Sequence, residues 1–64
     1  MYYDNAATAF TKAIQIKPED GDCHFMLGKT YAQQGNVPAS MREYNILQKL
    51  DPKLAQELQR FLNQ

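Results

Sequence analysis

Two prolines, Pro18 and Pro52, stand 34 positions apart, and the residues that precede them match in kind at the same offset. Small residues align with small ones, aromatic with aromatic and apolar with apolar, with a few changes of size. The clearest pairs are Ala6 with Ser40, Phe10 with Tyr44, and Ile16 with Leu50. A period of this length indicates a repeat architecture, in which each unit is a small motif that stacks on the next.

The composition favours helix over strand, because Ala, Leu, Gln, Lys and Glu are abundant while Val and Thr are sparse. Proline and glycine breaks divide the chain into four segments of helical length, at about 2–16, 21–34, 37–50 and after the Asp51-Pro52 pair. Asp20, Asn36 and Asp51 are expected N-caps. Gly35 is expected to end the second helix as a left-handed residue.

Apolar residues recur in these segments at spacings of three, four and seven, which places them on one face of a helix. The expected buried stripe of the second segment is His24, Leu27, Gly28 and Tyr31. That of the third is Met41, Tyr44, Ile46 and Leu47, and that of the fourth is Leu54, Leu58, Phe61 and Leu62.

The repeat also carries a specific motif. The second segment reads His24-x2-Leu27-Gly28-x2-Tyr31, and the third reads Ser40-x3-Tyr44 before Pro52. These residues resemble the tetratricopeptide repeat, whose pattern is W-x2-L-G-x2-Y, then A-x3-F, then P. The resemblance covers essentially the whole chain. His24 departs from it by standing where the family favours Trp, which makes that contact smaller and partly polar.

Gly28 has a physical reason to be in this motif. It lacks a Cβ, so a neighbouring helix can approach its backbone closely, and this packing must offset a helix-propensity penalty of about 1 kcal/mol. Ala6 and Ser40 would play the matching role on the partner helices. We expect three aromatic side chains to fill the spaces between the helices: Phe10, Tyr31 and Tyr44.

The resemblance implies an all-α fold of antiparallel helix-turn-helix pairs, stacked as a short right-handed superhelix of about four helices. Residues 1–18 would be the second helix of an incomplete repeat, 19–52 one complete repeat, and 53–64 a capping helix with a polar outer face. The chain spans about one and a half to two repeats. We expect either the C-terminal piece of a longer array or a small protein completed by a second chain.

Charge and composition disfavour several classes of partner. The formal net charge is zero, whereas sequence-independent binding of nucleic acid or of anionic membranes needs a basic surface. No apolar run approaches the ~20 residues that cross a bilayer, so no membrane insertion is expected. The single cysteine, Cys23, cannot form an internal disulfide. It fits a reducing compartment, which slightly favours the cytoplasm.

The sequence gives little support to catalysis or metal binding. No nucleophile-and-base arrangement and no phosphate-binding glycine loop is present, so neither an enzyme nor a cofactor is expected. Cys23 and His24 are adjacent, but a zinc site needs three or four ligands and the chain has no second Cys or His. Glu19, Asp20 and Asp22 cluster at a helix start, where carboxylates serve capping and solubility.

Members of this family bind an extended peptide or a helix in a concave groove lined by the first helix of each repeat. The resemblance implies a protein–protein interaction scaffold whose partner is a peptide or another protein. The groove residues would be Asp22, Phe25, Lys29 and Gln33, which share one helix face, with Gln59 extending it. Phe25 is an aromatic residue on a polar stripe, and it could instead pack in the core or in an oligomer contact.

The first segment has an uncovered apolar flank if the chain is a monomer. Its residues are Tyr2, Tyr3, Phe10 and Ile14. Exposed apolar patches on small domains mark interfaces, so we expect a homo-oligomer. This leaves two alternatives to the scaffold interpretation: a structural module for self-association, and a regulatory fragment of a larger protein.

Overall fold

The computed structural model describes the backbone of residues 2–63 and the side chains of residues 7–63. Four α-helices follow one another along the chain: α1 Tyr2–Ile16, α2 Gly21–Gln33, α3 Val37–Leu50 and α4 Pro52–Leu62. The described backbone contains no strand. The all-α expectation is therefore confirmed. The ends of the first three helices lie within one residue of the predicted ones, whereas α4 ends at Leu62 and was expected to reach residue 64.

Polar side chains cap the N-termini of three of these helices, as predicted. The Oδ1 atoms of Asp20, Asn36 and Asp51 each accept a backbone N–H from the first turn of α2, α3 and α4, at 3.3, 3.3 and 3.4 Å. Gly35 has a φ of 81°, which a residue with a Cβ rarely adopts, and it lets the chain reverse between α2 and α3.

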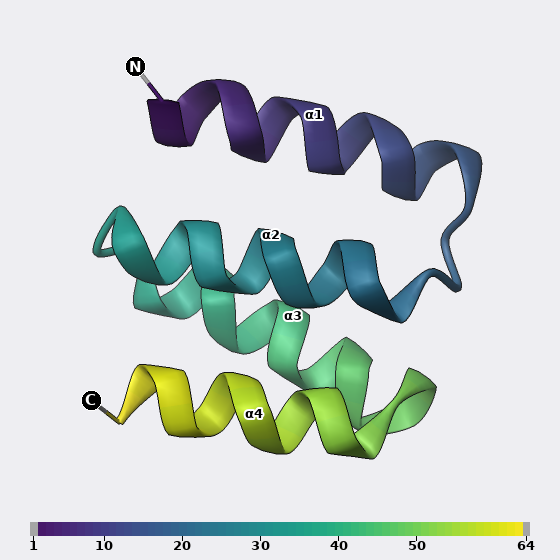
Figure 1. Cartoon of the computed structure of the whole chain (residues 1–64), viewed down its shortest axis with the longest axis vertical. Coiled ribbons are helices and arrows are strands. Elements are labelled where there is room, and N and C mark those ends of the chain that lie inside the picture. Colours follow the sequence, from purple (N-terminus) through teal and green to yellow (C-terminus); the bar gives the residue numbers. More distant parts are fainter. Residues whose placement is uncertain (1, 64) are drawn as a thin grey trace.

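The helices are arranged around α2. Successive helices run in opposite directions, and α1, α2 and α4 lie side by side while α3 lies behind α2 and α4 (Figure 1). Helix α2 packs against the other three helices and α3 packs against α4. Within the described chain, α1 packs against α2 but against neither α3 nor α4. The result is a slab with principal extents of 28 × 27 × 14 Å.

The core lies between α2, α3 and α4. Leu47 and Leu58 are fully buried and form a cluster with Ala55. Half-buried side chains pack against this cluster: Phe25, Tyr44, Leu54 and Leu62. None of the described side chains of α1, which are those of residues 7–16, is fully buried.

Gly28 lies where α3 and α4 both come close to α2, as the motif predicts. A Cβ built at Gly28 would lie 2.6 Å from Cδ2 of Leu58 and 3.3 Å from Cβ of Glu43. The buried Ser40 hydroxyl donates a 2.8 Å hydrogen bond to the Gly28 carbonyl. The small residues at positions 28 and 40 therefore let side chains of α3 reach the backbone of α2.

One predicted stripe differs from the structure. Ile46 and Met41 were expected on the apolar side of α3, but they are 38% and 40% exposed. Their places in the core are taken by the small residues Ala39 and Ser40, which are buried with Leu47. The face of α3 that packs against α2 therefore carries smaller and more polar side chains than the sequence analysis predicts.

Candidate protein-interaction surface

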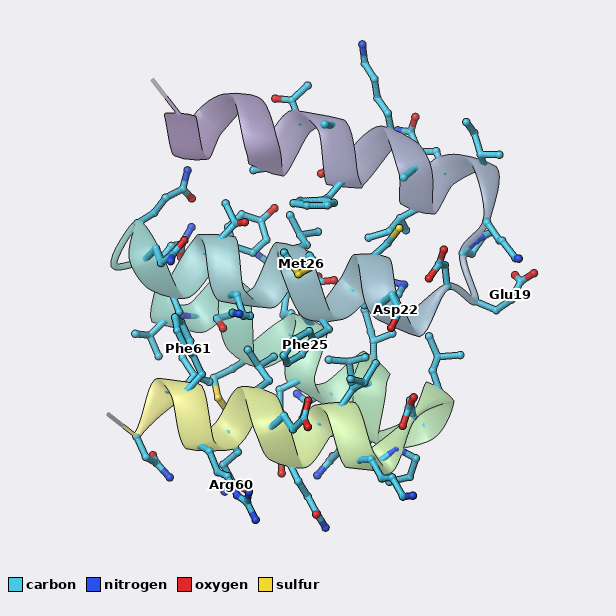
Figure 2. All side chains as sticks on the ribbon, viewed as in Figure 1. Glu19, Asp22, Phe25, Met26, Arg60 and Phe61 are labelled. Carbon is cyan, nitrogen blue, oxygen red and sulfur yellow. The ribbon has the colours of Figure 1, made fainter. Side chains whose placement is uncertain are left out.

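The four residues predicted for the groove on α2 fall into two groups. Asp22 and Gln33 are exposed, whereas Phe25 and Lys29 are half-buried. Phe25 points from α2 towards α4 and packs against the core cluster of Leu47, Ala55 and Leu58 (Figure 2). Phe25 therefore has a packing role, and part of its ring remains open to solvent.

Lys29 is held by two aromatic rings. Its Nζ lies 5.4 Å from the centre of the Phe25 ring and 5.3 Å from that of Phe61, which comes from α4. A lysine ammonium at this distance is attracted by the negative face of each ring. The sequence analysis predicts Phe61 only as part of the apolar stripe of α4. Its seven-residue spacing from Leu54 does not indicate a contact with Lys29.

Gln59 lies apart from this group. It lines two hollows, of about 140 and 300 Å³, which it shares with Tyr44 of α3. Residues two positions apart on a helix face different ways, so Gln59 and Phe61 do not share a side of α4. The structure thus brings Asp22, Phe25, Lys29 and Gln33 together on α2 and places Gln59 at the edge between α3 and α4.

The flank predicted on α1 is described in part. Phe10 and Ile14 are half-buried, and α1 packs against α2. The side chains of Tyr2 and Tyr3 lie outside the described residues. Met26 of α2, which is 40% exposed, adds apolar surface to the molecule. A contact between this flank and a second chain stays a prediction.

A buried polar pair, not anticipated from the sequence, lies beneath the surface. Nδ1 of His24 is 2.7 Å from Oε1 of Glu43, and Nε2 is 2.8 Å from the Pro18 carbonyl oxygen. Both ring nitrogens therefore face oxygens. Two states fill both hydrogen bonds: an imidazolium with a carboxylate, or a neutral imidazole with a protonated carboxyl. The enclosed position indicates a structural role.

The acidic start of α2 affects two titratable groups. The hydrogen bond from the Cys23 backbone N–H holds the pKa of Asp20 below its ordinary value. Burial raises the pKa of the Cys23 thiol, and the nearby carboxylates of Asp20 and Asp22 raise it further. The thiol therefore stays protonated near neutral pH, which makes it a weak nucleophile.

The side chains of residues 7–63 hold no group of three or more His, Cys, Asp or Glu placed to bind a metal ion. The helices described here are also too short or too polar to cross a membrane.

The stacked antiparallel hairpins, packed through a glycine and presenting a polar helix face, define a helical-repeat protein. A family model described as tetratricopeptide repeat matches residues 3–64, and the chain belongs to that family. Repeats of this family generally mediate protein–protein interaction and are typically non-catalytic. The chain matches none of the curated proteins or solved structures with which it was compared. The boundaries at residues 18 and 52 stay a prediction.

Proposed function

We propose that this chain binds a peptide or partner protein through the outward face of α2, with the adjoining edge of α4. The observation that supports this most directly is the position of Lys29 between the rings of Phe25 and Phe61. A free lysine loses much rotamer entropy when it binds a partner. A lysine that is already held between two rings loses less of this entropy, so a contact between its charge and a partner costs less free energy.

The charges on this face suggest the chemistry of the partner. Asp22 and Lys29 lie two helical turns apart on the same side of α2, a separation of about 10 Å along the axis. A partner that carries a basic group opposite Asp22 and an acidic group opposite Lys29 would complement both. The exposed amide of Gln33 can add a hydrogen bond to a peptide backbone. The chain's net charge of zero supports a protein partner over nucleic acid.

A random peptide library displayed on phage tests this proposal, with the purified chain as bait. We expect selected peptides to carry an acidic and a basic residue. Their Kd should rise roughly fivefold to tenfold for Lys29→Gln, because one charge-assisted contact is lost. Lys12→Gln is the matched control, since Lys12 is exposed on α1. Peptides that bind wild type and Lys29→Gln equally well would contradict the proposal.

Phe61→Leu gives a second test, because it leaves the Lys29 charge in place and removes one of the two rings that hold it. We expect a smaller loss of affinity than for Lys29→Gln. Circular dichroism of each variant separates a loss of binding from a loss of fold.

A further inference from the structure

A second surface lies away from the outward face of α2. A hollow of about 430 Å³ separates the loop between α1 and α2 from the outer side of α3. Helices α1 and α3 do not pack against each other in the described chain. The lining is mostly apolar, and it comprises Pro18, Glu19, Asn45, Ile46, Lys49 and Leu50.

Two large apolar side chains of this hollow remain open to solvent. Ile46 and Leu50 are each 38% exposed. Exposed apolar groups that gather around a hollow are typical of a contact surface.

The hollow carries one charge of each sign. Glu19 belongs to the loop, from which it points outward at the edge of the molecule, and Lys49 belongs to α3 (Figure 2). Both residues are exposed, and within residues 7–63 neither of them forms an ion pair. Ile46 and Leu50 line the same hollow as these two charges.

We propose that this hollow is the contact between two copies of the chain related by a twofold axis. In such an interface the same patch meets itself, so residue i meets residue j and j meets i. A patch with one anion and one cation is complementary to its own rotated copy. Glu19 of each chain would then face Lys49 of the other, on both sides of a shared apolar centre.

A second copy fits this surface better than a strongly charged partner does. A patch with charges of one sign would repel itself, whereas this one is balanced, and the chain's net charge of zero adds no general repulsion. The patch is a small part of a total surface of 4484 Å². Since stable interfaces bury about 800 Å² per partner, we expect a weak dimer, with a Kd between about 10 µM and 1 mM.

Sedimentation equilibrium of the full chain over that concentration range tests the proposal. Glu19→Lys and Lys49→Glu should each raise the Kd of the dimer by about tenfold or more. Each variant places like charges opposite each other on both sides of the axis. Lys53→Glu is the matched control: it makes the same charge change at an exposed position on α4 and should leave the dimer unchanged.

Mixing the two single variants gives the sharpest result. A heterodimer of Glu19→Lys with Lys49→Glu restores an opposite-charge pair on both sides of the axis, so it should form as well as wild type does. The double variant should likewise recover its homodimer. Both substitutions are at exposed positions, so the fold should be retained, and circular dichroism checks this.

Three outcomes would overturn the proposal. The chain could be a monomer throughout the range, neither charge reversal could change the Kd of the dimer, or the mixed single variants could fail to form a heterodimer. A dimer disrupted by Ile14→Gln alone would place the contact on the flank of α1 instead. The test is independent of peptide binding, because Lys29→Gln should leave the dimer intact.

Discussion

His24 of α2 and Glu43 of α3 are joined by a 2.7 Å contact between Nδ1 and Oε1, with 5% and 9% of the two residues exposed. The other ring nitrogen of His24 reaches the Pro18 carbonyl. One imidazole thus ties α2 to α3 and to the loop that follows α1. It does so where the tetratricopeptide pattern has Trp, so hydrogen bonds replace part of an aromatic contact.

This arrangement predicts unequal effects for two substitutions at Glu43. Glu43→Ala should lower the free energy of unfolding by about 1–3 kcal/mol, because it leaves a buried ring nitrogen without a partner. Glu43→Gln should lower it less. Its amide can donate to Nδ1 of a neutral imidazole while Nε2–H still donates to Pro18. Urea unfolding followed by circular dichroism measures both, and equal losses would show that the hydrogen bonds contribute little.

Gly28→Ala should destabilise the protein by about 1–3 kcal/mol through overpacking. The added Cβ would lie 2.6 Å from Cδ2 of Leu58, which is fully buried and has little room to rotate. Helix propensity works in the opposite direction by about 1 kcal/mol. Gly21→Ala is the control, since its Cβ meets ordinary contacts of 3.5 Å or more. We expect it to be neutral or stabilising, and a Gly28→Ala variant with the same thermal midpoint would refute close packing.

Stability should depend on pH through Asp20. Its folded pKa lies below the ordinary value of 3.8, because the ionised carboxylate accepts the Cys23 backbone N–H. The stabilisation is therefore present above that ordinary value and is lost as the pH falls through the folded pKa. The difference in Tm between wild type and Asp20→Ala should be constant well above the ordinary value of 3.8 and should shrink as the pH falls below it. A difference that stays constant down to low pH would exclude the carboxylate as its source.

Cys23 should react slowly with iodoacetamide near neutral pH. Burial and the neighbouring carboxylates raise the pKa of its thiol above the ordinary 9.0, so little thiolate is present. The alkylation rate should increase when urea unfolds the chain. It should also increase, by less, in Asp22→Asn, which removes one of the neighbouring charges. A folded-state rate as fast as the unfolded one would contradict this.

The positions of the helices could be predicted from the sequence because their signals are local. Asp20, Asn36 and Asp51 act within one turn of their own helices, and Gly35 acts on its own φ angle. Gly28 was also identifiable, because a glycine within a helix is unfavourable unless something packs closely against it.

Contacts between helices could not be predicted in the same way. The pairs His24–Glu43 and Lys29–Phe61 depend on how far each helix is rotated about its axis, which apolar spacing alone fixes only roughly. Ile46 was misplaced for the same reason. Its spacing suits an apolar stripe, but the small residues of α3 are those that face α2.

Nuclear Overhauser effects between Gly28 and Leu58 test most directly whether α2 and α4 stack through a residue without a side chain. The Hα protons of Gly28 should give strong cross-peaks to the δ-methyl protons of Leu58, because a Cβ there would lie only 2.6 Å from Cδ2. If those cross-peaks are missing while the amide pattern still shows four helices, the helices do not stack as described.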